Sequence, residues 1–211
     1  EIMRNLPDER IVYFGDTARV PYGSKSADTV IRYSRQIVRF LQTRNVKAIV
    51  IACNTASALA LETIEKEIDL PILGVVKPGA EMALQTTKNK KIGVIATEGT
   101  IHSGLYQRLI SQKDPEVTVY GQPCPLFVPL VEEGWTKDPI TEEVARRYLK
   151  DLLGKDIDTL IMGCTHYPLL RSLMRQVAGE SVTLVNPAYE TARALRELLK
   201  EHGIENDGHE E

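Results

Sequence analysis

The chain carries one strand-and-loop pattern twice, and this repeat constrains its fold more than any other feature. An apolar run ends in a cysteine at Cys53, and a similar run ends in Cys164, 111 positions later (164 − 53). Three further pairs of similar segments recur in the same order: residues 11–15 with 117–121, 26–44 with 140–153, and 74–78 with 183–187. Four matches in one order predict two copies of a single structural unit.

Each copy alternates apolar strands with amphipathic helices. Residues 48–52 are uninterruptedly apolar, as in strands that are buried on both faces of a parallel sheet. Residues 26–44 place apolar side chains at helical spacing. Strands that alternate with helices indicate βαβ units. We therefore predict an α/β fold class with two similar doubly wound domains of mostly parallel sheets, and an active site in the cleft between them.

The remaining elements and the domain boundaries follow from the same pattern. We expect the end of a helix within residues 1–9, strands at residues 11–14, 72–76, 91–96, 117–121, 158–163 and 183–187, and helices at residues 55–68, 103–112, 140–153 and 188–201. The first domain takes residues 1–76 and 186–211, and the second takes residues 77–185. Residues 203–211 are expected to form a mobile polar tail.

One part of the second copy has no counterpart in the first. The strand and polar loop at residues 91–104 would have their equivalent about 106 positions earlier, which lies before residue 1. We therefore expect the first domain to be incomplete at its N-terminal side. A longer gene product with an apolar strand and a polar, glycine-containing loop in that place would confirm this expectation, and a start methionine at this point would contradict it.

Composition and charge exclude several classes of protein. The 211 residues carry a net charge of −3 and a sequence pI near 5.9, which predicts no general affinity for nucleic acid. No apolar run approaches the ~20 residues of a membrane-spanning helix, and the first residues do not form a signal-peptide pattern. We therefore predict a cytoplasmic protein with neither a membrane nor a nucleic acid as partner.

The three cysteines are predicted to be free thiols. They are too few and too widely spaced for a disulfide framework, and they lack the close spacing of a zinc site, so we expect no metal. Cys124 lies between two prolines in a loop, which favours a structural role. Each of the other two, taken alone, also fits the packing of a small apolar side chain.

The positions of Cys53 and Cys164 favour chemistry over packing. Each directly follows a predicted strand and precedes a predicted helix start, where ligands bind in open α/β sheets. Free N–H groups at a helix start favour a thiolate and can also hold a substrate carboxylate. Equivalent residues of two facing domains would present their thiols from opposite sides, as proton removal from one face of a carbon and delivery to the other requires.

Four motifs give the chain a close resemblance to the bacterial glutamate racemase family, within the wider aspartate/glutamate racemase superfamily. The resemblance covers essentially the whole chain, and its motifs are residues 13–19, 21–23, 52–57 and 163–168. It implies the interconversion of L- and D-glutamate for peptidoglycan synthesis, without a cofactor or metal, in an enzyme whose small-molecule partner is glutamate. Whether the chain forms a homodimer stays open.

The resemblance also implies roles for individual residues. Cys53 and Cys164 are the catalytic pair, His166 assists Cys164, and Asp16 and Glu132 match acidic active-site positions. The segments that hold the substrate correspond to Pro21, Tyr22, Gly23, Asn54, Thr55, Thr97, Thr165 and His166. From the residues alone, each acidic side chain equally fits a turn or a helix cap, and His166 fits a polar residue at a helix start.

The chain departs from the family pattern in two places. The family begins with a strand that ends in an Asp-Ser-Gly loop, whose aspartate assists the first cysteine, and this loop is absent from the sequence. The activity of the chain as given is therefore expected to be impaired. Val20 stands where the family often has a cysteine; as an apolar side chain it is expected to take no part in the chemistry.

Three other interpretations stay open at this stage. A related two-thiol racemase or isomerase would act on aspartate, hydantoins or maleate instead. A binding or sensor protein on the same scaffold would hold an acidic metabolite in the cleft without converting it. Redox-active cysteines are disfavoured, because the two thiols are far apart in sequence and no CxxC motif is present.

Overall fold

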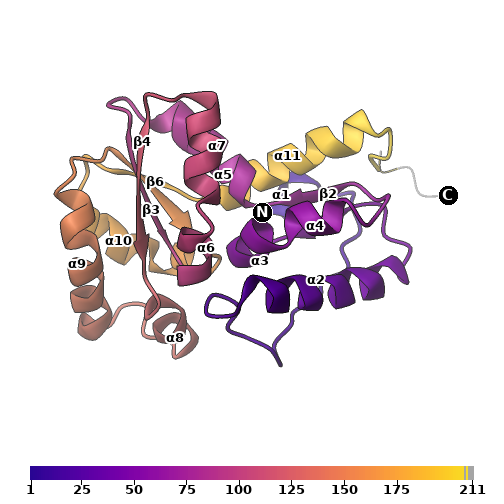
Figure 1. Cartoon of the computed structure of the whole chain (residues 1–211), viewed down its shortest axis with the longest axis horizontal. Coiled ribbons are helices and arrows are strands. Elements are labelled where there is room, and N and C mark those ends of the chain that lie inside the picture. The colour runs from indigo at the N-terminus through magenta and orange to yellow at the C-terminus, as the bar shows by residue number, and fades with distance from the viewer. Residues whose placement is uncertain (207, 209–211) are drawn as a thin grey trace.

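The computed structural model describes residues 1–206 and 208, and the rest of the predicted C-terminal tail lies outside the described residues. The fold is α/β, with parallel strands in two separate sheets (Figure 1). The strands are β1 (Ile49–Ile51), β2 (Ile72–Gly74), β3 (Lys91–Ala96), β4 (Thr118–Pro123), β5 (Thr159–Gly163) and β6 (Thr183–Val185). The helices are α1 (Ile2–Asn5), α2 (Ala27–Gln42), α3 (Asn54–Leu59), α4 (Leu61–Glu65), α5 (Val76–Thr86), α6 (Glu98–His102), α7 (Leu105–Lys113), α8 (Phe127–Glu132), α9 (Pro139–Leu153), α10 (Arg171–Ala178) and α11 (Pro187–Glu201), with a 3₁₀ helix η1 (Tyr167–Leu170).

The larger sheet has the strand order β4-β3-β5-β6, and its central strands β3 and β5 are buried on both faces. Successive side chains of a strand point to opposite faces, and β5 shows this directly. Leu160 and Met162 pack in a core with residues of α9 and α10, whereas Ile161 packs in a second core with residues of α5 and α7. Figure 1 shows α9 and α10 on one side of the sheet and α5 and α7 on the other. The continuous apolar run of β5 is therefore explained by two covered faces.

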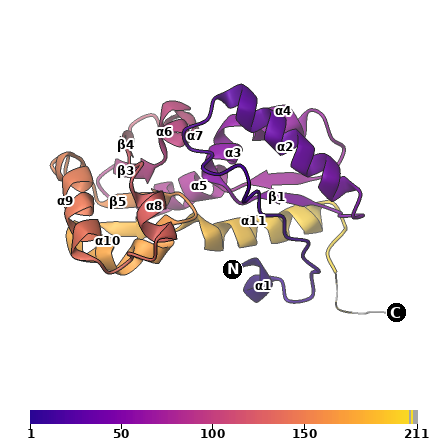
Figure 2. The same cartoon turned by 90° about the horizontal axis from the view of Figure 1, so that it is seen from below.

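In the smaller sheet β1 pairs with β2 in parallel, and successive side chains again point to opposite faces. Ile49 and Ile72 pack against residues of α2, α3 and α4, while Val50 and Leu73 face α11. Figure 2 shows α11 running from the larger sheet toward the smaller one. One long helix therefore contacts both sheets, through β5 of the larger and β2 of the smaller. The predicted domain boundaries at 76/77 and 185/186 stay a prediction.

Residues 11–14 do not form the predicted strand. The segment has no regular structure, and its side chains are largely exposed, 48% for Ile11 and 87% for Tyr13. In the second copy the equivalent strand, β4, pairs with β3. No described residue forms an equivalent of β3 in the first copy, and a strand without a neighbour leaves its backbone N–H and C=O groups to water. The prediction was wrong because an apolar pattern cannot supply the pairing partner.

The predicted helices are largely present, and one of them is divided. The segment predicted as one helix at 55–68 is α3 and α4, which meet at Ala60, and the helix predicted at 103–112 is α7, preceded by the short α6. No helix among the described residues is both long and apolar enough to cross a membrane.

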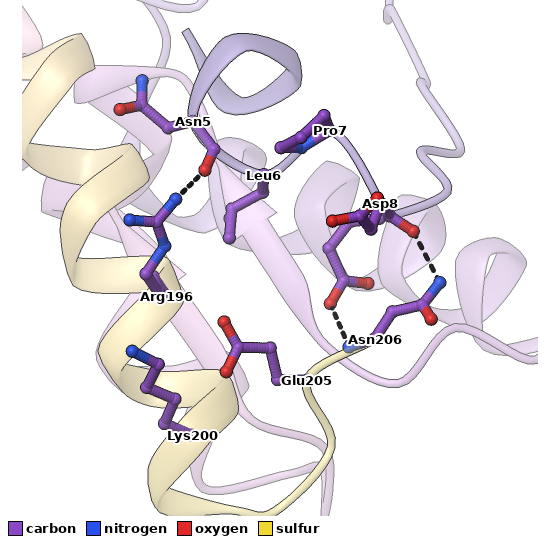
Figure 3. A pocket seen from close by; sticks show the side chains of 9 residues that line it. Asn5, Leu6, Pro7, Asp8, Arg196, Lys200, Glu205 and Asn206 are labelled. Atoms are coloured by element: carbon purple, nitrogen blue, oxygen red, sulfur yellow. Dashed lines mark hydrogen bonds between the residues drawn. The ribbon is translucent and has the colours of Figure 1, made fainter. Parts of the chain in front are cut away.

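The end of the described chain is tied to the loop after α1 (Figure 3). Arg196 of α11 donates to the carbonyl of Asn5, the backbone N–H of Asn206 donates to Glu9 Oε1 at 2.8 Å, and Asn206 Nδ2 donates to the carbonyl of Asp8 at 2.5 Å. These residues line a cavity of about 210 Å³. None of its lining residues belongs to the predicted site, so this cavity is separate from the two cysteines.

Candidate active site

Both cysteines occupy the predicted position at the carboxyl end of a parallel strand. Cys53 follows β1 and is the N-cap of α3, where its Sγ accepts a hydrogen bond from the backbone N–H of Ala56 at 3.5 Å. Cys164 follows β5, is 8% exposed and precedes η1. A negative charge on Cys53 would raise the pKa of Cys164, so the two sulfurs lie within electrostatic reach of each other. The internal repeat therefore places two thiols in one region of the fold.

The environment of these thiols favours their protonated form. Burial raises the pKa of Cys53, and it raises the pKa of Cys164 to about 12. The N–H groups at the helix starts act in the direction that the sequence predicts: those of Ala56 and Thr55 lower the pKa of Cys53, and those of His166 and Tyr167 lower the pKa of Cys164. The effect of burial on the pKa of each thiol is larger than the opposing effect of these hydrogen bonds. A thiolate at either position is therefore a strong base once it forms.

His166 joins Cys164 to Glu132. Its Nδ1 lies 3.7 Å from Cys164 Sγ, and its Nε2 lies 2.5 Å from Glu132 Oε1. Glu132 ends α8, 34 residues earlier in the chain, and its side chain is 66% exposed. The resemblance already linked His166 to Cys164, and the tertiary structure adds Glu132 as the partner of His166. A carboxylate on one ring nitrogen orients the imidazole.

Asp16 lies beside Tyr22 and Arg19 instead of a thiol. Its Oδ1 accepts from Arg19 Nε at 2.8 Å, and its Oδ2 accepts from the Tyr22 hydroxyl. Burial and this hydrogen bond both raise the pKa of Tyr22, which lies within electrostatic reach of Cys53. Asp16 therefore holds the loop that contains Tyr22 and Gly23.

Three threonine hydroxyls connect α3 to α6. Thr55 Oγ1 lies 2.9 Å from Thr97 Oγ1 and 3.2 Å from Thr100 Oγ1, and the last two lie 3.1 Å apart. Gly23 packs against Thr97 so closely that a Cβ at Gly23 would lie 2.5 Å from the Thr97 Cβ, and the Gly99 N–H donates to the Gly23 carbonyl at 2.8 Å. The sequence prediction missed Thr100, whose backbone N–H donates to the hydroxyl of the helix cap Thr97 at 3.4 Å.

Asn54 is also held from the other half of the chain. Tyr106 of α7 donates a hydrogen bond from its hydroxyl to Asn54 Oδ1 at 2.7 Å, and both residues are 4% exposed. No sequence pattern indicates Tyr106, because this contact spans 52 residues. Of the other predicted substrate-binding residues, Thr165 is exposed beside Cys164, where its side chain lowers the pKa of that thiol, and Pro21 is exposed in the loop before Tyr22.

Cys124 is placed differently from the other two thiols. It is fully buried, and its Sγ donates to the carbonyl of Gln122 at 3.5 Å. Burial raises its pKa strongly, with no opposing hydrogen bond from a helix start. In the described part of the chain, no cluster of three or more His, Cys, Asp or Glu side chains is arranged to hold a metal ion.

Comparison with known proteins identifies close relatives of this chain. The sequence model of the Asp/Glu/Hydantoin racemase family matches residues 2–205. Glutamate racemase of Geobacter metallireducens is 51% identical over 200 residues, which are 95% of this chain and 74% of the relative. The enzyme of the same name from Persephonella marina is 52% identical over 196 residues, or 93% of this chain and 75% of the relative.

Among solved structures, glutamate racemases also match this chain. The glutamate racemase isoform RacE1 from Bacillus anthracis matches with a TM-score of 0.95 and 41% identity, and the alignment covers 98% of this chain and 77% of that one. Glutamate racemase from Francisella tularensis, solved in complex with D-glutamate, matches with a TM-score of 0.91 and 39% identity over the same shares. An aspartate racemase from Picrophilus torridus, with a TM-score of 0.54 and 18% identity, shares the fold.

Proposed function

The chain belongs to the Asp/Glu/Hydantoin racemase family, and we propose that Cys53 and Cys164 carry the two proton transfers of its reaction, the interconversion of L- and D-glutamate. The high identity to glutamate racemases over nearly the whole chain makes it an amino-acid racemase that acts on glutamate. D-glutamate made in this way supplies peptidoglycan synthesis, the standard role of the family. The observation that carries the assignment of the residues is that two thiols stand at equivalent strand ends of a duplicated structure.

The two thiols divide the reaction between them. One, as a thiolate, takes the α-proton and leaves the electron pair of the broken C–H bond on the α-carbon. The other, as a thiol, then gives its proton to the opposite face of that carbon and becomes the thiolate. The free enzyme therefore alternates between two protonation states, and each state accepts one enantiomer.

The surroundings of the thiols assist these two steps unequally. His166 and Glu132 form a hydrogen-bonded pair next to Cys164, so that the imidazole can accept the proton of this thiol or return it. Cys53 receives N–H groups from the start of α3 and a hydrogen bond from the Thr55 side chain. Since Cys164 is buried and Cys53 is half-buried, bound glutamate must displace water before the stronger electrostatics of a dry site can act on the developing carbanion.

The polar groups around Cys53 fit a dicarboxylate substrate. We propose that the amide of Asn54, the hydroxyls of Thr55 and Thr97 and the loop of Tyr22 and Gly23 hold the carboxylates of glutamate. The support for this assignment is that these groups gather at one helix start, where backbone N–H groups favour an anion.

Two further points extend the proposal. We place the protein in the cytoplasm, because the mechanism needs two reduced thiols and a reducing compartment maintains them. A homodimer stays a prediction, as does the division into domains at 76/77 and 185/186.

The proposal is tested by following the optical activity of L- and D-glutamate, with L- and D-aspartate as comparison substrates, in the intact gene product. Solutions of L-glutamate and of D-glutamate should each lose their optical activity, and in ²H₂O the α-proton should exchange with solvent. A binding or sensor protein would hold glutamate without exchanging this proton. Loss of activity in Cys53→Ser and in Cys164→Ser supports the two-thiol mechanism, whereas full racemisation by either variant would exclude it.

A further inference from the structure

Tyr106 lies between the positions of the two catalytic thiols. Its hydroxyl donates to Asn54, the residue after Cys53, at 2.7 Å. Its ring lies against Gly163, the residue before Cys164, so closely that a Cβ at Gly163 would be 3.3 Å from Tyr106 Cε2. One buried, rigid side chain thus contacts the sequence neighbours of both cysteines.

The hydroxyl of Tyr106 has little freedom to move away from Asn54. A Cβ at Gly79 of α5 would lie 3.2 Å from the Tyr106 hydroxyl oxygen, so the phenol occupies space that glycine leaves open. Burial raises the pKa of Tyr106 far above its ordinary value, and the phenol stays protonated. It therefore remains a hydrogen-bond donor toward Asn54 throughout the physiological pH range.

This donor decides which way the Asn54 amide faces. An asparagine side chain accepts hydrogen bonds through Oδ1 and donates them through Nδ2. Because Oδ1 accepts from Tyr106, Nδ2 must point away from the phenol. Among the described residues Nδ2 donates to no protein acceptor, and every fully buried side-chain nitrogen or oxygen there has a partner. Nδ2 therefore keeps some contact with solvent at the start of α3, although Asn54 as a whole is only 4% exposed.

We propose that Tyr106 is a positioning residue for racemisation: its hydroxyl holds the Asn54 amide so that Nδ2 donates to a carboxylate of bound glutamate. The inference rests on the proposed function for the identity of the substrate. Without the phenol hydroxyl, the amide is free to rotate by half a turn and present Oδ1, which repels a carboxylate. Substrate binding should then weaken, although Tyr106 itself does not touch the substrate.

The test is a double-mutant cycle in the intact gene product. The values of kcat and KM are measured from both enantiomers for the wild type, Tyr106→Phe, Asn54→Ala and the variant with both substitutions. Tyr106→Phe should lower kcat/KM by roughly tenfold, the effect expected for one hydrogen bond to a charged group, and chiefly by raising KM. In the Asn54→Ala background the same substitution should have no further effect, because the amide through which it acts is gone.

Controls separate positioning from a structural role. Tyr148→Phe removes a hydroxyl that accepts from the backbone N–H of Leu126 at 3.3 Å, and its kinetics should match the wild type. Effects of Tyr106→Phe and Asn54→Ala that multiply in the double variant, or an unchanged KM in Tyr106→Phe, would overturn the inference.

Asn54→Ala gives a check that does not alter Tyr106. It must lower kcat/KM at least as far as Tyr106→Phe does, and full activity in Asn54→Ala would also overturn the inference. A wild type that fails to racemise glutamate would instead contradict the proposed function itself, so the two failures are distinguishable.

Discussion

The imidazole of His166 is held at both of its nitrogens, with Glu132 Oε1 at 2.5 Å from Nε2 and Cys164 Sγ at 3.7 Å from Nδ1. This arrangement connects a buried thiol to a carboxylate that is 66% exposed. Cys53 has no such connection among the described residues; its hydrogen bonds come from the helix start and from Thr55. The two thiols therefore differ in their hydrogen-bond partners, and the proposed mechanism predicts a different proton route at each.

Glu132→Gln should lower kcat/KM by roughly tenfold, because Nε2 of His166 loses a charged hydrogen-bond partner. The two enantiomers of glutamate have equal free energy, so kcat/KM must fall equally in both directions, and any asymmetry will be visible only in kcat and KM separately. Steady-state kinetics from L- and D-glutamate measure both. Glu142→Gln, which breaks the exposed pair with Arg146, is the matched control and should leave the kinetics unchanged.

Cys124→Ala should retain racemase activity while losing about 1 kcal/mol of unfolding free energy, the typical cost of removing a small buried group. The reason is that Cys124 is fully buried and contacts neither catalytic thiol through a hydrogen bond. Thermal or denaturant unfolding gives the stability, and the racemisation assay gives the activity. Loss of racemisation in a folded Cys124→Ala protein would show that this thiol has a functional role.

The pH dependence of kcat/KM should reflect the raised pKa values of the catalytic thiols. The free enzyme needs one thiolate, and burial raises the pKa of Cys53 and brings that of Cys164 to about 12. A raised pKa leaves less thiolate at a given pH, so kcat/KM should rise about tenfold per pH unit and still be rising at the ordinary thiol pKa of ~8.5. A plateau reached already at pH 7 would show that another group, such as His166, lowers the pKa of the reacting thiol.

Asp16→Asn should raise KM several-fold and destabilise the protein by about 1 kcal/mol, because Tyr22 and Arg19 lose a charged hydrogen-bond acceptor in a partly buried place. Its effect on kcat should be smaller, since Asp16 acts on the loop of Tyr22 and Gly23 and contacts no thiol. Glu67→Gln removes an exposed carboxylate paired with Arg35 and serves as the control, with a stability change below about 0.5 kcal/mol. A fall in kcat with unchanged KM in Asp16→Asn would instead place this carboxylate in the chemical steps.

Much of the fold could be predicted from local patterns. Apolar runs and helical spacing predicted all six strands of the two sheets and most helices, because burial on one or both faces imposes a period on the sequence itself. The internal repeat added the equivalence of Cys53 and Cys164. The same local pattern at residues 11–14 predicted a strand that does not form, since a strand also needs a neighbour and no described segment provides one.

The sequence by itself determined which residue types stand at the two strand ends, and therefore where acid–base chemistry could occur. Only the tertiary structure decided which distant side chains support them: Glu132 on His166, Thr100 beside Thr55, and Tyr106 on Asn54. These contacts join residues 34 to 52 positions apart. Periodicity reports which face of an element is buried, but packing in three dimensions chooses the partner that each polar group finds there.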